Sequence, residues 1–419
     1  MPSVPAPLDR LFSRIDALEG EMVDFQKSIT AIPALSPING GSGEWDKAMH
    51  VKAWLESHGL SDIRQIDAPD PDAKNGVRPN LIVTIPGRSD DRTIWFMAHL
   101  DVVPEGDRKL WDSDPWQAEV RDGMIYGRGT EDNQQGVTSS VFVLRALVEE
   151  GVTPDYTVRV ILAADEETGS GLGLDYLLEH HGDLFRPEDL VVVPDAGLPD
   201  SSMIEVAEKS IVWFRFRTLG KSCHGSEPQQ GINAFDAASD LVVRLRQLYQ
   251  LFDARDEVFA PPISTFAPTR KEANVPNVNT IPGEDIFYLD CRLLPAYAVT
   301  ELEQAVRRIC DGVERDFGVT IEITTTQRAE AAPPTAPDAP VVTGLQEGIA
   351  TVYGVDAQPM GIGGGTVAAF FRRAGVPAAV WSTIEDVCHQ PNEHCRIRSM
   401  VNDTKVFAHL CVRNAIRGT

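Results

Sequence analysis

The chain has 419 residues, of which 42% are hydrophobic and 24% charged, and its formal net charge is −24. This length exceeds the ~250–300 residues at which a single core stops growing, so we expect two domains. The acidic balance repels phosphate groups and argues against nucleic acid as a partner.

The chain also lacks the signals of export and of membrane insertion. No run approaches the ~18 apolar residues of a membrane span, and the N-terminus has no basic region followed by an apolar core. The six cysteines form no CxxC pair, which is typical of free thiols in a reducing compartment. We therefore expect a cytoplasmic protein with no signal peptide and no membrane partner.

The first half of the chain alternates between helical and strand-like patterns. The expected elements are helices at 8–34 and 45–59, strands at 80–87 and 93–98, a helix at 134–149, a strand at 156–163, a helix at 172–182 and a strand at 190–193. Strands that alternate with helices predict an α/β fold with a mostly parallel sheet.

The pattern changes near residue 208. The next elements are a strand at 210–217, a helix at 232–252, a Pro- and Asn-rich loop at 260–283, a strand at 286–292, a helix at 298–316 and a strand at 320–324. A Pro-rich linker at 331–337 leads to a helix from 340, a Gly-rich turn at 361–365, a further helix, a strand at 376–381 and a helix at 398–416. We predict a main domain formed by 1–208 and 328–419, with an inserted α+β domain at 209–327.

Acidic residues and a histidine follow the predicted parallel strands. His99 ends the strand at 93–98, Glu166 and Glu167 follow the strand at 156–163, and Asp195 follows the strand at 190–193. Asp132 lies in a glycine-containing turn before the helix at 134–149. Because the carboxyl ends of parallel strands meet at one edge of a sheet, we expect these side chains to converge there. Imidazole and carboxylate groups without thiolate predict a site for divalent metal ions.

At this point the chain resembles a known family. The matching strings, in order, are His99-Leu100-Asp101, Gly127-Arg128-Gly129 with Asp132, Glu166-Glu167, Pro194-Asp195-Ala196-Gly197, Gly363-Gly364-Gly365-Thr366 and His389-Gln390-Pro391-Asn392-Glu393. They are similar to the motifs of the M20 family of metallopeptidases and amidohydrolases, which includes carboxypeptidase G, acetylornithine deacetylases, succinyl-diaminopimelate desuccinylases and dipeptidases.

The resemblance implies a site for two metal ions. Asp132 would bridge the ions, His99 and Asp195 would complete one site, and Glu167 and His389 would complete the other. The ions are expected to be Zn²⁺, with Co²⁺ or Mn²⁺ as alternatives.

The resemblance also implies how the ligands are assisted. Asp101 would accept the other ring N–H of His99 and so fix its tautomer. Glu166 would be the general acid and base rather than a ligand. The family places a cis peptide after the bridging aspartate, here between Asp132 and Asn133.

The inserted domain would act as a lid and as a dimerisation domain. His224 matches a lid histidine that contacts the oxyanion, often across a dimer interface, and Asn279 and Arg292 match residues that hold a substrate carboxylate. The loop residues Gly364, Gly365 and Thr366 precede a helix, where their N–H groups could bind an anion or simply form a turn. Val367 and Ala368 follow, where relatives often carry an acidic residue, so the substrate preference of those relatives does not transfer directly.

These residues predict a hydrolase for small substrates. The expected reaction is cleavage of an amide or peptide bond next to a free carboxylate, in dipeptides or N-acyl amino acids, with Glu166 assisting the attack of a water shared by two metal ions. The alternatives are an N-succinyl-diaminopimelate desuccinylase, an acetylornithine-type deacetylase, or a catalytically silent binding protein on the same scaffold. The resemblance implies a homodimer formed through the inserted domain.

Overall fold

The computed structural model describes residues 6–414. Two expectations fall partly outside this range. They are the absence of a signal peptide at the N-terminus and the end of the last helix at 416. The chain divides into two compact units. The first comprises residues up to Val206 together with Pro334–Pro359 and the stretch from Thr366 onward, and the second comprises Ala207–Pro333 and Met360–Gly365.

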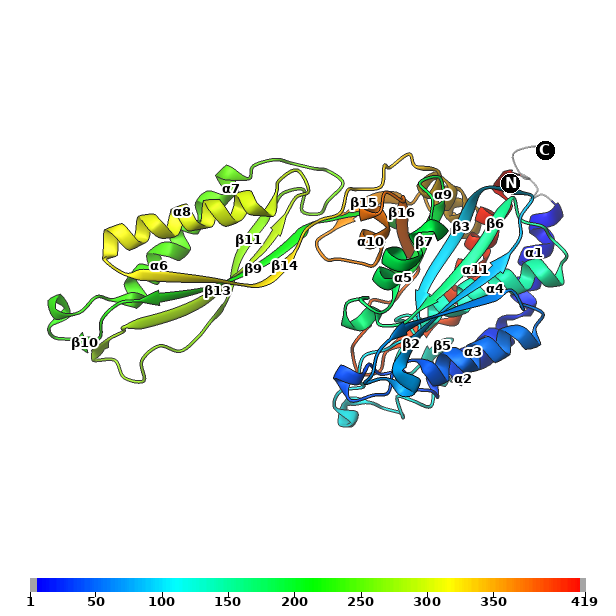
Figure 1. Ribbon diagram of the computed structural model, residues 1–419, viewed down its shortest axis with the longest axis horizontal. Helices are drawn as coiled ribbons and strands as arrows, with labels where there is room; N and C mark the ends of the chain where they lie inside the picture. Colours follow the sequence, from blue (N-terminus) through cyan, green and yellow to red (C-terminus); the bar gives the residue numbers. More distant parts are fainter. Residues whose placement is uncertain (1–5, 415–419) are drawn as a thin grey trace. The chain divides into compact units, whose positions relative to one another are not determined.

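An eight-stranded sheet forms the centre of the first unit, and its last two strands lead into the second (Figure 1). In spatial order its strands are β1 (Ile63–Pro69), β2 (Val77–Ile85), β6 (Tyr156–Ala163), β3 (Ser89–His99), β7 (Leu190–Gly197), β16 (Ala378–Ser382), β8 (Met203–Glu208) and β15 (Gln358–Ile362). The four middle strands, β6, β3, β7 and β16, are parallel, whereas β1 pairs antiparallel with β2, β2 with β6, and β8 with β16. The predicted α/β fold with a mostly parallel sheet is confirmed.

Helices cover both faces of this sheet. They are α1 (Ala6–Ala17), α2 (Glu19–Thr30), α3 (Trp45–Ser57), α4 (Gln134–Glu149), α5 (Leu174–His181), α9 (Pro340–Tyr353), α10 (Ala368–Arg373) and α11 (Ile397–Cys411). On β3, Trp95 belongs to a buried cluster with Leu177 of α5 and Phe371 of α10. Its neighbour Phe96 points to the other face, where its ring lies 4.6 Å from that of Phe407 on α11. A sheet that is buried on both faces explains the continuous apolar runs of its strands. A small sheet of β4 (Glu119–Arg121), β5 (Met124–Tyr126) and β17 (His394–Arg396) adjoins these elements.

The second unit has a ferredoxin-like arrangement. Its elements are β9 (Ser210–Leu219), α6 (Ala234–Arg244), α7 (Leu248–Leu251), β11 (Thr265–Lys271), β13 (Glu284–Leu293), α8 (Val299–Phe317) and β14 (Thr320–Ala329). The sheet order is β11-β13-β9-β14, and all its pairs are antiparallel. Alternate residues of β9 and β13 are buried against α6 and α8, and those between them are more accessible. The predicted α+β character of the insertion is confirmed.

Two local expectations are wrong. The helix expected at 8–34 is two helices, α1 and α2, with Leu18 between them. The expected loop at 260–283 contains the edge strand β11, and the two-residue strand β12 (Thr280–Ile281) pairs with β10 (Cys223–His224). In the described residues no helix is long and apolar enough to cross a membrane.

Candidate metal centre

The side chains predicted to bind metal in the first unit lie together at the carboxyl end of the parallel strands. His99 ends β3 and Asp195 lies near the end of β7. The short 3-10 helix Glu166–Thr168 follows β6 and carries both glutamates. Since β6, β3 and β7 run parallel, their ends meet at one edge of the sheet.

Asp132 stands between two imidazoles. Its Oδ1 lies 3.0 Å from Nε2 of His99, and its Oδ2 lies 3.0 Å from Nε2 of His389. Asp195 Oδ1 is 3.5 Å from Nε2 of His99, and Glu167 Oε2 is 3.1 Å from Nε2 of His389. Two groups of three side chains with the donor atoms for a metal ion result, His99 with Asp132 and Asp195, and Asp132 with Glu167 and His389, and in each group these atoms lie within 4.8 Å of one another.

These residues fit a pair of divalent cations. The donor set is nitrogen and oxygen only, which suits Zn²⁺, Co²⁺ or Mn²⁺. Glu167 supplies a second observation, because its Oε1 is buried and has no hydrogen-bond partner among the described residues. A buried carboxylate oxygen without a partner is costly, and a cation would give it one.

The carboxyl groups of the cluster differ in the direction in which their pKa values are shifted. Burial opposes ionisation of Asp132, but hydrogen bonds from His389 and His99 outweigh it and hold the pKa of this carboxyl well below its usual range. Burial raises the pKa of Glu166 well above 4.5, and the neighbouring carboxylates of Asp195 and Asp101 add to the shift. Glu166 Oε2 lies 4.0 Å from Nε2 of His99, at the margin of the ligand group. A carboxyl that protonates readily beside the ligands suits proton transfer.

Asp101 connects His99 to the turn of the two glutamates. The nearest acceptor for Nδ1 of His99 is the main-chain oxygen of Asp101 at 3.1 Å, and the carboxylate Oδ1 is 3.4 Å away. The same carboxylate accepts the backbone N–H groups of Glu166 and Glu167, each at 3.0 Å. Asp101 therefore orients His99 mainly through its backbone and holds the turn 166–167 with its side chain.

Sequence reasoning assigned no role to Asn133. The peptide bond between Asp132 and Asn133 is cis, as the family resemblance implied. The Asn133 amide donates to the main-chain oxygen of Pro194 at 2.6 Å and to Asp195 Oδ1 at 2.7 Å. Its own oxygen accepts the backbone N–H of His99 at 3.4 Å. One amide thus joins the turn of Asp132 to two other ligands.

A buried ion network lies beneath the turn of Glu166 and Glu167, and it too had no role in the sequence analysis. Arg78 on β2 donates from Nε to Glu44 at 2.6 Å, and its Nη1 lies 3.3 Å from Asp165. Glu44 also accepts the backbone N–H of Asp165 at 3.2 Å. Arg78 is 2% exposed and Glu44 is fully buried, so this pair has no solvent to replace a lost partner. No spacing signal links residues 44, 78 and 165, because they meet only in the folded chain.

The residues predicted in the second unit fall at two places. His224 on β10 pairs with Thr280 of β12, and the main-chain oxygen of Asn279 accepts the N–H of Gly225 at 2.7 Å. Arg292, near the far end of β13, donates to both carboxylate oxygens of Asp290 at 2.7 and 3.0 Å.

The Gly-rich loop lies beside Arg292. The Arg292 Nη1 donates to the main-chain oxygen of Gly363 at 2.6 Å. The neighbouring Gly364 and Gly365 have no backbone within 4 Å of an added Cβ. Thr366 Oγ1 accepts the N–H of Ala368 at 3.3 Å at the start of the six-residue helix α10. The loop is open, and its contact with Arg292 is made through the main-chain oxygen of Gly363. Asn279, which was expected to hold the substrate carboxylate together with Arg292, lies with His224 at the other place.

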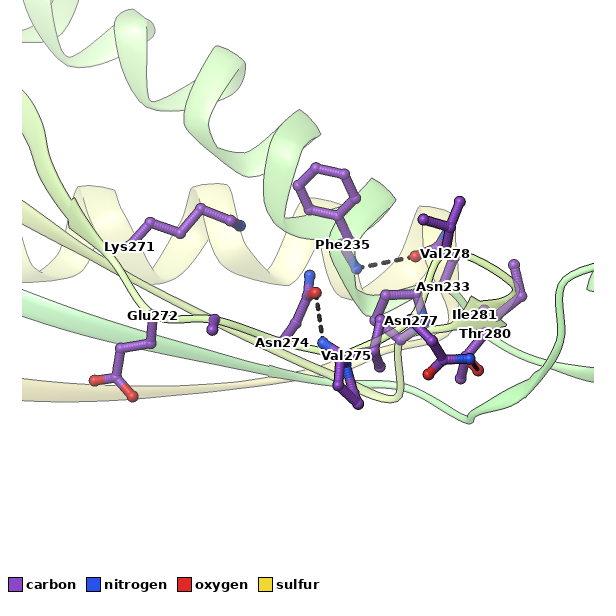
Figure 2. A pocket seen from close by; sticks show the side chains of 13 residues that line it. Asn233, Phe235, Lys271, Glu272, Asn274, Val275, Asn277, Val278, Thr280 and Ile281 are labelled. Atoms are coloured by element: carbon purple, nitrogen blue, oxygen red, sulfur yellow. Dashed lines mark hydrogen bonds between the residues drawn. The ribbon is translucent and has the colours of Figure 1, made fainter.

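A cavity of about 740 Å³ adjoins the β10–β12 ribbon. Figure 2 shows Phe235 of α6 on one side of it and the segment from Lys271 to Ile281 along the other. The side chain of Val278 is fully exposed and that of Phe235 is 45% exposed. All the residues that line this cavity belong to the second unit.

Comparison with known proteins assigns the chain to a family. The sequence profile of peptidase family M20/M25/M40 matches residues 95–413. The chain belongs to this family. Among its relatives, an uncharacterized metallohydrolase of Methanocaldococcus jannaschii is 38% identical over 411 residues, which cover 94% of this chain and 99% of the relative. A succinyl-diaminopimelate desuccinylase of Nitratiruptor is 25% identical over 89% of this chain and 94% of its own length.

Solved structures of M20 enzymes share the fold. Human carnosine dipeptidase 1 superposes with a TM-score of 0.71 at 20% identity, over 99% of this chain and 100% of that one. The YxeP protein of Bacillus subtilis, a dinuclear metal-binding M20 peptidase, superposes with a TM-score of 0.64 at 17% identity, over 95% of this chain and 99% of that one. The chain is therefore an M20 metallohydrolase, a class that hydrolyses amide bonds.

Proposed function

We propose that this M20 enzyme hydrolyses an amide or peptide bond next to a free carboxylate, in dipeptides or N-acyl amino acids. The observation that carries the proposal is Asp132, whose two carboxylate oxygens each face a different imidazole at 3.0 Å. In this proposal His99, Asp132 and Asp195 hold one ion and Asp132, Glu167 and His389 hold the other. Zn²⁺ is the proposed metal, with Co²⁺ and Mn²⁺ as alternatives.

The proposed chemistry depends on Glu166. When bound, the divalent ions polarise the scissile carbonyl and make a water acidic near neutral pH. Glu166 removes a proton from the attacking water and delivers it to the leaving nitrogen. Asp101 keeps Glu166 in reach by accepting the N–H groups of the turn on which Glu166 lies.

Recognition of the substrate carboxylate is assigned to Arg292 and the adjacent loop. Asp290 binds the guanidinium through two hydrogen bonds and leaves part of its N–H fork available. A planar fork held in this way matches a carboxylate. The N–H groups of Gly364, Gly365 and Thr366, which follow Gly363 in the chain, are proposed to contribute.

The second unit supports a homodimer with His224 acting in trans. The strand β13 pairs with β9 without a register shift from Glu284 to Leu293, and the β10–β12 ribbon with His224 and Asn279 continues beyond its Glu284 end. At ~3.4 Å per residue, the stretch from Glu284 to Arg292 measures about 27 Å. A dipeptide cannot span this distance, so His224 and Arg292 of one chain cannot contact one substrate, whereas those of two chains can.

The edge strand β11 is the proposed dimer contact. In the described chain β11 pairs with β13 only, and an open edge is a template for another strand. A second cavity of about 390 Å³ runs between α6 and the end of β11, and Phe235 lines both this cavity and the first. Light scattering should find a dimer for wild type and a monomer for Phe235→Glu. Val148→Glu, at a 42% exposed site on α4, is the matched control and should stay dimeric.

A substrate screen and one variant test the reaction. Amine release should be measured on N-acyl amino acids, α- and β-linked dipeptides and N-succinyl-diaminopimelate. Activity on the last would favour the desuccinylase function that the relatives' names suggest. Glu166→Gln should retain its metal and lose about 10²–10⁴-fold in kcat. The control Glu179→Gln, on α5, should retain both its metal and its kcat. Full activity in Glu166→Gln would disprove the assigned base, and an inactive wild type with bound metal would indicate a silent binding protein.

The trans role has a separate test. His224→Ala and Glu166→Gln chains are each expected to be nearly inactive as homodimers. In a mixed dimer, one site would combine an intact Glu166 with an intact His224 of the other chain. Regained activity in verified heterodimers would support donation across the interface, and none would contradict it.

A further inference from the structure

Two buried glutamates link the turn of Asp132 to the loop of His389, and neither is a proposed ligand. Glu131 precedes Asp132, and its carboxylate reaches the loop before His389. There it accepts the backbone N–H groups of Glu385 and Val387, each at 2.6 Å. These residues are more than 250 positions apart in sequence, as the separations of 254 and 256 show.

Glu393 makes the opposite connection. It follows His389, and its Oε1 accepts the backbone N–H groups of Glu131 and Asp132, each at 3.1 Å. Its Oε2 accepts a hydrogen bond from Arg128 at 2.5 Å. Each segment therefore holds the backbone of the other with its own carboxylate. We call this pair, Glu131 and Glu393, the carboxylate clamp.

Burial makes the clamp rigid. Glu131 is 3% exposed and Glu393 is fully buried. A buried carboxylate that loses its N–H donors finds no water to replace them. The separation of the two segments is therefore set by four such N–H contacts.

His389 itself has little else to fix it. It lies in a loop with a positive φ of 60° and its side chain is 51% exposed. A metal-binding histidine usually donates its second ring N–H to an acceptor, and His99 has one in the Asp101 carbonyl. For Nδ1 of His389 the structure gives no such acceptor anywhere in residues 6–414. Apart from the contacts of its Nε2 with Asp132 and Glu167, the position of its ring therefore depends on the backbone of its loop.

We propose that Glu131 and Glu393 are positioning residues that keep Asp132 and His389 at metal-binding distance and so determine occupancy of the ion bound by Asp132, Glu167 and His389. This inference rests on the proposed function, because it presumes that those three residues bind an ion. The other ion, bound by His99 and Asp195, would depend much less on the clamp.

The test measures metal binding as well as activity. Glu131→Gln replaces one acceptor oxygen by a donor that opposes a backbone N–H. Glu393→Gln keeps only one acceptor oxygen, so its new NH2 group must oppose either the two backbone N–H groups or the guanidinium of Arg128. Dialysed protein is analysed for metal content, and Co²⁺ is titrated into metal-free protein and followed by its visible absorption. We expect each variant to retain one tight ion and to bind the second about 10- to 100-fold more weakly than wild type. Raised metal concentration should restore much of the activity to both variants and none to Glu166→Gln.

Glu385→Gln is the matched control. Its side chain pairs with Arg396 at 2.8 Å and takes no part in the carboxylate clamp, and the substitution leaves the backbone N–H that donates to Glu131 unchanged. Both ions should bind to this variant as tightly as to wild type. Should a glutamine variant fail to fold, Glu393→Asp keeps the charge but is too short to reach all its donors, and the same weakening is expected.

The outcomes separate the two proposals. A wild type that binds fewer than two ions would overturn the proposed function. A wild type with two ions and clamp variants that bind both equally well, even with a lower Tm, would overturn the positioning role. The double variant should weaken the second ion by less than the product of the single effects, because each carboxylate serves the same separation. A fully multiplicative effect would contradict a joint clamp.

Discussion

The two proposed ligand groups share Asp132 but are built differently. The strand-end group, Asp132 with His99 and Asp195, draws its other ligands from β3 and β7 of the parallel sheet. His99 there is 1% exposed and its backbone is paired with β6. The loop group, Asp132 with Glu167 and His389, draws them from a short turn and a loop, and its histidine is half exposed.

The difference shows two ways to hold a ligand. In the strand-end group the sheet hydrogen bonds that make the fold also fix the ligand backbone. In the loop group the backbone is fixed by side chains, namely Asp101 under Glu167 and the carboxylate clamp around His389. The first arrangement is expected to be the stiffer, and the second to respond more strongly to substitution of the side chains that hold its backbone.

The largest effect is expected at the shared ligand. Asp132→Ala should remove ions from both groups and lower kcat/KM by at least ~10³-fold, because metal ions supply several kcal/mol of transition-state stabilisation. Metal analysis of dialysed protein and initial rates check this. A variant that keeps one ion per chain would mean that the two groups do not share Asp132.

The buried ion pair of Arg78 and Glu44, next to the Glu167 turn, should contribute strongly to the free energy of unfolding. Arg78→Met leaves the buried Glu44 without its partner, and breaking a buried pair costs ~3–5 kcal/mol. Urea unfolding measures the loss. The control Arg398→Met removes an exposed pair with Asp16 and should cost less than ~1 kcal/mol. Equal effects of the two variants would contradict the view that the buried network supports the turn.

The two histidines should differ in what their loss does to the metal-free protein. His99→Ala removes a buried ring, opens a cavity and leaves three carboxylates facing one another, so unfolding should occur at markedly lower temperature. His389→Ala removes a half-exposed ring whose contacts with Asp132 and Glu167 are screened by solvent, so it should lower stability less than His99→Ala does. Each variant should retain one ion per chain. Calorimetry of the chelated proteins measures their unfolding temperatures, and metal analysis counts the ions. A lower unfolding temperature for His389→Ala than for His99→Ala would contradict the expected difference.

The smallest effect is a pH dependence of the loop group. Hydrogen bonds to Asp132 and Glu167 raise the pKa of His389 to about 10. The metal-free fold therefore holds this proton more tightly than the unfolded chain. The resulting stability is complete below pH 6.5 and is lost as pH rises towards 10. Metal binding needs the neutral ring, so affinity should change in the other direction and rise ~10-fold per pH unit for one displaced proton.

Titration calorimetry in buffers of different ionisation enthalpy measures the protons released on metal binding between pH 6.5 and 9. Wild type should release at least one more proton per chain than His389→Ala. Equal proton release by the two proteins would mean that metal binding does not remove a proton from His389.

Local sequence signals predicted much of the fold. The periodicity of hydrophobic residues and the length of each segment predicted the bounds of β6 and α4 to the residue, because both elements are buried, regular and bounded by turns. They missed β11, where Pro268 interrupts the pattern and coincides with a shift in register. Proline is accepted there because β11 is an edge strand whose outer side needs no N–H donor. They also missed the break at Leu18, since apolar residues continue across it.

The amino-acid sequence alone determined the types of donor atom in the candidate site and the strand ends on which most of them lie, because strand polarity and side-chain chemistry are local properties. The tertiary structure decided which carboxylates hold which loops. It brought Glu131 to the loop of His389 and Glu393 to the turn of Asp132, and it placed the ribbon of His224 beyond the Glu284 end of β13, about 27 Å along that strand from Arg292. These relations join segments that are far apart in the chain, and only the packed fold brings their hydrogen-bonding groups into contact.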